Sequence, residues 1–538
     1  MPMMTGGEAV AETLAAAGVD TVFGIVSVHN IPIYDAIARA GKIRAVDVRH
    51  EQGALHAADG YSRRTGKLGV AITSTGPGAS NGMTGLFEAG FASSRVLMIT
   101  GQTETQHYGK GKGVLHEAEK QLEMLRTVTR RTESPRHVGE VTTLLERVMR
   151  DILSGRPQPG AVEIPVDLQY AKADFTIPTD IAGTVLAPGE AEVAAAANLI
   201  SSAGTKRFIL AGGGVIRADA SDELVRLAET LDCPVYTTVN GRGAIPEDHP
   251  LSMGTFLMPS AGLLAEADLM IAVGTRFQGG TTGNYQFKPP GKLLHIDADN
   301  HMISLNYRAD VGVVSDAKPA LAAIQDALNA EPGDATFLTL VRSAADAARE
   351  EIRSRMGPDF EAIMDCIRES LPASGNIVRD ATIPAYVWGN TLIPILSPRT
   401  SMHSTSAAIG PGLPLGLGAA IGSDEKTVII QGDGGFMLNI GELATAAQYK
   451  TPVIVCVFND QGYGVLRRIQ ASRFEGRNNG VDLATPDFAA VANAMGVRGI
   501  SVSGLAGFRE AFAEAMAHDG PVLLDIDLAT LSPMKLPF

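Results

Sequence analysis

Short apolar runs alternate with amphipathic segments along almost the whole chain. The clearest pair lies near the C-terminus, where β-branched residues fill 427–431 and 452–458 and a helix-like segment separates the two runs. Runs of this length are typical of buried strands, and their alternation with helices is typical of βαβ units. The pattern therefore predicts an α/β protein with parallel sheets.

The first third of the chain follows the same alternation. Apolar residues at helical spacing in 6–17 precede strand-like runs at 22–26, 43–48, 70–75 and 160–167. A second series follows a stretch rich in Pro, Thr and Asp. Its strands are predicted at 207–215, 234–239, 267–274 and 292–299, with a helix at 222–231.

An alanine-rich, charged stretch over 334–355 predicts an exposed helix, after which a third series begins. We predict three doubly wound parallel-sheet domains at 1–172, 189–332 and 358–538. A linker at 173–188 and a linker helix at 333–357 join them. A length of 538 residues exceeds one hydrophobic core and suits three domains of ordinary size.

The net charge of the chain limits the kinds of binding partner that we expect. The net charge is −14 and the pI is near 5.3, which argues against nucleic acid or an anionic membrane as a partner. The segment 110–136 is locally basic and has two interpretations: a solvated helix face and loop, or a contact for a phosphate-bearing substrate.

The cysteines and the N-terminal segment indicate in which cellular compartment the protein is expected. The three cysteines lie far apart without metal-binding spacing, so neither a disulfide framework nor a zinc site is indicated. The N-terminus lacks the pattern of a signal peptide, and no apolar stretch has the length of a membrane span. We expect a cytoplasmic protein.

The candidate chemistry lies between the two runs near the C-terminus. Gly432-Asp433-Gly434-Gly435 follows the first run, and a helix N-terminus reached through glycines is suited to phosphate. Asp460 follows the second run, so Asp433 and Asp460 would lie at neighbouring strand ends. Two carboxylates beside a diphosphate suit Mg²⁺.

This pair of turns, GDG and later Asn459-Asp460-x-Gly462, resembles the diphosphate and metal motif of the thiamine diphosphate (ThDP) enzymes. The resemblance implies that Asp433, Asp460 and the carbonyl of Gly462 hold the metal. Many family members have Asn where this chain has Asp460. The resemblance also implies cofactor contacts from Gly432, Asp433, Gly434, Gly435, Asp460, Gly462 and Val465.

A second motif strengthens the resemblance. The string HEQGALHAADGYSRRTGKLGV, followed by GPGASN, is similar to the pyrimidine-binding domain of the acetohydroxyacid synthase branch. Local sequence alone favours interpreting Glu51 as an acid stabilised in the first turn of a helix. The resemblance reverses this interpretation, because Glu51 matches the glutamate that hydrogen-bonds the cofactor's aminopyrimidine. Ala407 and Ile409 match the segment that contacts the 4′-amino group and supports the bent cofactor.

The resemblance covers essentially the whole chain and implies pyrimidine-binding, middle Rossmann-like and diphosphate-binding domains. It implies a homodimer or homotetramer with active sites at the subunit interface. It allows FAD in the middle domain but does not favour it. The triplet Gly212-Gly213-Gly214 lacks the GxGxxG spacing of a dinucleotide site. The segment 251–261 looks shorter than the FAD-contacting segment of the acetohydroxyacid synthases, although Gly274-Thr275-Arg276-Phe277 matches theirs.

The substrate-facing positions depart from the named family activities. A histidine at the position of His29 resembles benzaldehyde lyase and cyclohexanedione hydrolase more than the acetohydroxyacid synthases. Its side chain is suited to proton transfer near neutral pH. The alternative is that His29 only caps nearby backbone. His116 is the second candidate acid or base. Ile469 replaces the synthases' substrate-selecting tryptophan. Arg467 and Arg468 are candidates for a substrate carboxylate or are simply exposed.

We therefore predict an enzyme that uses ThDP and Mg²⁺ to decarboxylate a 2-oxo acid and then protonates the decarboxylated intermediate or joins it to an acceptor, like acetolactate synthase. The alternative is a ThDP-dependent lyase that cleaves a 2-hydroxy ketone, a cyclic dione or a 2-hydroxyacyl-CoA. A cofactor-binding scaffold without catalysis is the third hypothesis, and the presence of Glu51, Asp433 and Gly462 argues against it.

Overall fold

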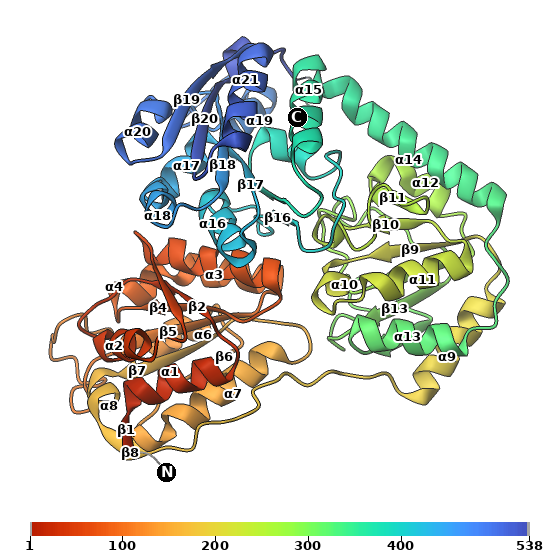
Figure 1. Ribbon diagram of the computed structural model, residues 1–538. Helices are drawn as coiled ribbons and strands as arrows, with labels where there is room; N and C mark the ends of the chain where they lie inside the picture. Colours follow the sequence, from red (N-terminus) through yellow and green to blue (C-terminus); the bar gives the residue numbers. More distant parts are fainter. Residues whose placement is uncertain (1–2, 535–538) are drawn as a thin grey trace.

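Three six-stranded parallel sheets, each flanked by helices, form the computed structural model, which describes residues 3–534 (Figure 1). This confirms the predicted α/β fold class. In the N-terminal domain the sheet order is β3(Arg44–Asp47), β2(Thr21–Gly24), β4(Gly69–Thr73), β5(Val96–Gln102), β7(Gly160–Pro165), β6(Arg131–Glu133). Its helices are α1(Gly6–Ala16), α2(Ile31–Ala40), α3(Glu51–Thr65), α4(Pro77–Asn81), α5(Met83–Ala92), α6(Gln121–Arg126), α7(Val141–Leu153) and α8(Val166–Tyr170).

The middle domain repeats this architecture. Its order is β11(Ser252–Thr255), β10(Val235–Thr237), β9(Arg207–Ala211), β12(Leu269–Val273), β13(Leu293–Asp297), β14(Val311–Val314). Its helices are α9(Glu190–Ser202), α10(Gly213–Arg217), α11(Ser221–Leu231), α12(Ala261–Leu264) and α13(Ala317–Ala327).

The C-terminal domain has the order β16(Ser401–His403), β15(Asn376–Arg379), β17(Thr427–Gly432), β18(Val453–Asn459), β20(Val522–Asp527), β19(Arg498–Ser503). Its helices are α15(Pro358–Ser370), α16(Gly412–Ser423), α17(Asp433–Phe436), α18(Glu442–Tyr449), α19(Gly464–Arg473), α20(Phe488–Ala494) and α21(Gly504–Ala517).

Alternate residues of each central strand enter separate hydrophobic cores. In β17, Val428 and Ile430 pack with α15 and α21, whereas Ile429 packs on the other face. Successive side chains of a strand point to opposite faces of the sheet. The sequence of a strand that is buried on both faces of a parallel sheet is therefore a continuous apolar run, which is the pattern found in this chain.

Several element boundaries differ from the sequence-based expectations. The run predicted as a strand over 207–215 ends at Ala211, because the glycine triplet turns the chain into α10. The run over 160–167 ends at Pro165, and α8 follows. The segment GPGASN at 76–81 contains the short helix α4, and α3 begins at Glu51, so this acid does lie in the first turn of a helix.

Both predicted connections contain more structure than expected. β8(Lys172–Asp174) pairs antiparallel with β1(Met3–Thr5) before the chain crosses to the middle domain. The helix α14(Ala335–Met356) was expected to be exposed, and that expectation is wrong for one face: Phe337, Val341 and Ala345 are buried against the middle domain. Figure 1 shows α14 running from the middle domain to α15.

The N-terminal and C-terminal domains meet through α3 and α16, which form the most extensive helix–helix contact of the chain (Figure 1). Glycines allow this approach. A Cβ on Gly60 would lie 2.0 Å from the carbonyl oxygen of Leu415, and one on Gly418 would lie 1.9 Å from that of Ala57. The glycine and alanine run in the sequence thus brings two helix backbones together.

Within residues 3–534, no helix is long and apolar enough to cross a membrane.

Candidate active site

A cavity of about 430 Å³ lies in the C-terminal domain at the carboxyl ends of β15 and β17. These strands are neighbours in the sheet, and the chain leaves them in opposite directions along it. Such a point, where the strand order reverses, is the usual place for a ligand in an open α/β sheet. Thr382 follows β15, and the segment from Gly432 to Gly435 follows β17.

The two predicted metal-binding aspartates line this cavity. Asp433 begins α17 and is 1% exposed, and Asp460 follows β18. Burial, together with the negative charge of Asp460, raises the pKa of Asp433 to about 6. Burial also raises the pKa of Asp460, although Arg467 opposes this from 3.5 Å. Two crowded carboxylates favour a cation between them.

Gly462 also lies in the cavity wall, and its amide donates to Oδ2 of Asp433 at 2.8 Å. No group of three or more His, Cys, Asp or Glu side chains within residues 3–534 is arranged to hold a metal alone. A metal here would take two carboxylates and a backbone carbonyl, and would need further oxygens from its ligand.

The glycines of this wall have no room for a side chain. A Cβ on Gly434 would lie 2.6 Å from the ring of Tyr463, and one on Gly432 would lie 2.8 Å from Oγ1 of Thr382. A Cβ on Gly464 would lie 2.0 Å from Oδ2 of Asp460. The backbone itself therefore forms the wall of the cavity, as a phosphate cradle requires.

The segment that precedes α16 also lines the cavity. Ala407 adopts a left-handed conformation with φ +62°, unusual for a residue with a side chain. Ile409, which is 37% exposed, and Val465 both line the cavity. An apolar side chain left uncovered beside strained backbone suits an apolar part of a ligand.

Asp380 holds this segment in place. Its carboxylate accepts from the amides of Gly410 (2.9 Å) and Gly412 (3.2 Å) and from Nε2 of Gln431 (2.5 Å). Burial raises the pKa of Asp380 to about 6, against the backbone donors that lower it.

Glu51 lies in the N-terminal domain, outside the set of described residues that line this cavity. It is 9% exposed at the start of α3, where Oε2 accepts from Nδ2 of Asn81 at 3.0 Å. A Cβ on Gly78 would lie 3.0 Å from its other oxygen. Within one chain, the structure brings together the predicted metal and diphosphate residues but leaves Glu51 apart.

His29 and His116 lie together in the N-terminal domain, with ring centroids 5.3 Å apart. His29 is 6% exposed, and its Nδ1 has no hydrogen-bond partner among the residues that the structure describes. Burial and the charge of His116 lower the pKa of His29. His116 has a φ of +59°, and its Nδ1 lies 3.3 Å from Oγ of Ser74. Ser74 in turn borders Gly78 beside Glu51.

An open cavity adjoins His29 on the same domain. Its walls include Glu104, His107, Asp167 and Tyr170. Both oxygens of Asp167 accept from Thr105, whereas no hydrogen bond or ion pair to the Glu104 carboxylate is found within residues 3–534. This wall carries negative charge.

The arginines that the sequence singled out differ in their surroundings. Arg467 pairs with Asp460 and Asp482, and Arg468 is exposed. In the segment 110–136, Arg130 and Arg131 contact Asp151.

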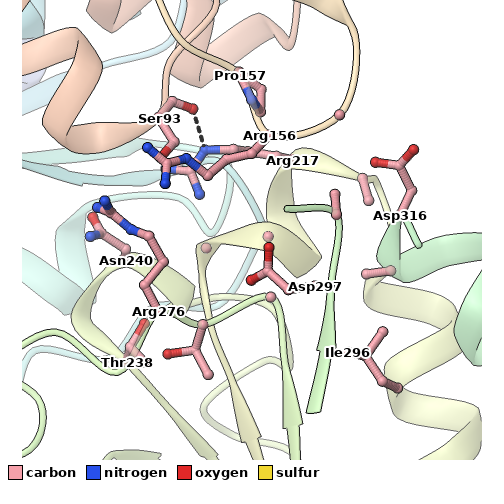
Figure 2. A pocket seen from close by; sticks show the side chains of 18 of the residues that line it. Ser93, Arg156, Pro157, Arg217, Thr238, Asn240, Arg276, Ile296, Asp297 and Asp316 are labelled. Atoms are coloured by element: carbon pink, nitrogen blue, oxygen red, sulfur yellow. Dashed lines mark hydrogen bonds between the residues drawn. The ribbon is translucent and has the colours of Figure 1, made fainter. Parts of the chain in front are cut away.

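A separate cavity of about 70 Å³ lies between the N-terminal and middle domains, at the carboxyl ends of the middle strands (Figure 2). Arg156, Arg217 and Arg276 surround it. Arg217 donates from Nε to the carbonyl of Ser93 at 2.7 Å, and Arg276 donates to that of Phe91. Burial and neighbouring arginines lower the pKa of Arg217 to about 9. The arginines bridge the two domains and leave a small cationic space.

Asp380 was not predicted from the sequence. It follows the short strand β15, whose four residues include only two apolar ones, so no apolar run marked its position. Ser74 likewise had no sequence signal, because its role depends on contacts across 42 positions to His116.

Comparison with known families decides the interpretation of this geometry. Models of the thiamine pyrophosphate (thiamine diphosphate) enzymes match in three consecutive parts: the N-terminal TPP binding domain at residues 4–124, the central domain at 193–324 and the C-terminal TPP binding domain at 385–526. The chain belongs to the thiamine pyrophosphate enzyme family.

Curated relatives place the enzyme within that family. It is 33% identical to a probable acetolactate synthase large subunit of Methanocaldococcus jannaschii, over 99% of this chain and 94% of the relative. It is 34% identical to a probable 2-ketoarginine decarboxylase of Pseudomonas aeruginosa, over 92% and 88%. The acetolactate synthase large subunit of Corynebacterium glutamicum is 32% identical, over 97% and 86%. The predicted ThDP-dependent enzyme of the acetolactate synthase-like branch is confirmed, and decarboxylation and carboligation of 2-oxo acids are the chemistry of this branch.

Proposed function

We propose that this enzyme uses ThDP with Mg²⁺ to decarboxylate a 2-oxo acid, and that it then protonates the decarboxylated intermediate or joins it to an acceptor carbonyl. The observation that carries the proposal is the single cavity that Asp433, Asp460 and Gly462 line together with Ala407 and Ile409. Its donor set and its glycine wall fit a diphosphate with a divalent cation.

In this proposal Asp433, Asp460 and the carbonyl of Gly462 hold Mg²⁺. The backbone of Gly432, Gly434 and Gly435 and the start of α19 at Val465 hold the diphosphate. Ile409 and Ala407 support the organic part of the cofactor. When bound, ThDP supplies the electron sink that decarboxylation of a 2-oxo acid needs.

Glu51 would hold and move a proton at the cofactor's aminopyrimidine. Since Glu51 does not line the cavity of its own chain, a second chain is needed to complete the site. We therefore propose a homodimer, alone or paired into a homotetramer, with each active site between two chains. Exposed Phe87 and Phe91 on α5 provide apolar surface for such a contact.

The test is an assay of the purified protein with ThDP, Mg²⁺ and a panel of 2-oxo acids that includes pyruvate and 2-ketoarginine. CO₂ release and new carbonyl products are followed together. CO₂ is expected from at least one acid, and the Glu51→Gln variant is expected to lose at least about 100-fold in turnover. Equal turnover in that variant would refute the role of Glu51.

A lyase is the second candidate, favoured by one observation. His29 is buried, its Nδ1 finds no partner within residues 3–534, and it lies beside His116 and a cavity. Its lowered pKa keeps it neutral near pH 7, so it can accept a proton from a substrate hydroxyl. Aldehyde release from a 2-hydroxy ketone, without CO₂, would establish the lyase and displace the first proposal.

We do not favour FAD as a second cofactor. The middle-domain cavity holds about 70 Å³, and Arg217 and Arg276 already donate to carbonyls of the N-terminal domain. A flavin would need these contacts to open. The visible absorption spectrum of the purified protein tests this, and a flavin band that persists through gel filtration would contradict it.

A further inference from the structure

A buried carboxylate of the C-terminal domain fixes the backbone just before Glu51. Glu442 begins α18 and is 1% exposed. Its Oε1 accepts from the amides of Arg49 (3.0 Å) and His50 (3.1 Å), and its Oε2 accepts from Oγ1 of Thr445 (2.6 Å). Hydrogen bonds to an ionised acceptor are about twice as strong as neutral ones.

Glu442 and Tyr449 pack closely against the backbone around Glu51. A Cβ on Gly53, in the first turn of α3, would lie 2.3 Å from Oε1 of Glu442. Tyr449, at the other end of α18, accepts at its hydroxyl from the amide of Asp47 at 2.8 Å. The short helix α18 therefore holds the whole connection between β3 and α3.

A second buried carboxylate makes the reverse connection. Glu88 lies on α5 of the N-terminal domain and is fully buried. It accepts from the amides of Thr405 (2.6 Å) and Ser406 (3.0 Å) and from Oγ of Ser406 (2.5 Å). Arg63 lies 3.0 Å from its Oε1. Thr405 and Ser406 immediately precede Ala407, the strained residue of the cavity wall.

We propose that Glu442 and Glu88 are reciprocal positioning residues. Each reaches across the domain contact and fixes the two amides before a cofactor-facing residue of the other domain, Glu51 or Ala407. This inference rests on the proposed function for the roles of Glu51 and Ala407, but the hydrogen bonds themselves do not depend on it.

The arrangement has a consequence for the assembled enzyme. In its own chain, Glu442 lies shortly after the segment of Asp433, which is proposed to bind the metal. It also fixes the backbone before Glu51 of the same chain, and that Glu51 completes the active site of the partner. The two carboxylates thus connect the half-sites of one chain, which serve two different active sites of the proposed dimer.

Three isosteric variants test the proposal: Glu442→Gln, Glu88→Gln and the control Glu223→Gln. Glu223 is 9% exposed and is paired with Arg226 at 2.9 Å, but it lies in the middle domain. In Glu88→Gln the new amide group must lie against a backbone donor, because each oxygen of Glu88 accepts from one backbone amide. In Glu442→Gln the remaining oxygen can still accept from both amides, but the negative charge that strengthens the two bonds is lost. The variants are compared by amide hydrogen exchange of the cofactor-free protein.

The expected result is a crossed pattern. Glu442→Gln should speed exchange in 47–54 by about tenfold and leave 404–412 unchanged, whereas Glu88→Gln should do the reverse. Glu223→Gln should change neither segment. Faster exchange in both segments in both variants, or in neither, would overturn the proposal. If Glu442→Gln does not fold, Thr445→Val, which removes one donor to Glu442, should give a smaller change in the same segment.

A second readout uses the loaded enzyme. Glu442→Gln should lower kcat about tenfold at saturating ThDP with little change in ThDP affinity, and Glu88→Gln should chiefly weaken ThDP binding. The same loss in both variants would argue for a merely structural role. If no substrate is turned over by the wild type, the proposed function fails, yet the exchange experiment still decides whether the carboxylates position their segments.

Discussion

The amide of Gly462 donates a hydrogen bond to Oδ2 of Asp433 at 2.8 Å, which joins the turns after two neighbouring strands. This bond orients one oxygen of Asp433 and holds the Gln461–Gly462 peptide against it. The proposed metal ligands are thus arranged by the protein before a metal binds, and such preorganisation lowers the cost of binding.

Removal of the Asp433 charge should abolish tight cofactor binding. Asp433→Asn leaves one carboxylate in the cavity and should weaken Mg²⁺-dependent ThDP binding by at least about 100-fold. Isothermal titration calorimetry at saturating Mg²⁺ measures this. Asp424→Asn, at an exposed left-handed position that asparagine tolerates, is the control for loss of a charge.

Binding of the metal and cofactor should depend on pH through Asp433. Its pKa is raised to about 6 without metal, so below that pH a proton competes with Mg²⁺. The apparent dissociation constant should rise by up to about tenfold for each pH unit below 6 and level off above it. An affinity that stays constant between about pH 5 and pH 7 would contradict this assignment.

His29→Ala should separate substrate chemistry from cofactor binding. His29 lies away from the metal cavity, so ThDP affinity should stay within about twofold of the wild type while turnover falls about 100-fold. Steady-state kinetics and calorimetry on the same preparation measure the two effects. His301→Ala, at an exposed position of the middle domain, should match the wild type.

Gly418→Ala tests the contact between α3 and α16. The new Cβ would lie 1.9 Å from the carbonyl oxygen of Ala57, so the helices must separate, at a cost of about 1–3 kcal/mol. The melting temperature should fall, and Glu51 and Glu442 should lose their alignment. Gly507→Ala in α21, where the nearest atom is 4.0 Å away, should instead keep or raise the melting temperature.

Much of this protein follows from local sequence. Strand-length apolar runs fix three parallel sheets, because a strand buried on both faces must be apolar throughout. The GDG turn and Asp460 predicted the carboxylate pair, since the carboxyl ends of parallel strands share one edge of the sheet. The string around Glu51 identified the family that the comparisons confirm.

The tertiary structure decided how these pieces relate. Glu51 and Asp433 were each predicted from a sequence motif. Only the fold shows that Glu51 does not line the cavity that Asp433 of the same chain lines. Glu442, Glu88 and Asp380 are single acids with no characteristic spacing. Their importance comes from backbone amides that lie far away in the sequence, as with Glu442 and His50, 392 positions apart. Local patterns specify which elements form, whereas the partners of a buried carboxylate exist only once the domains have packed.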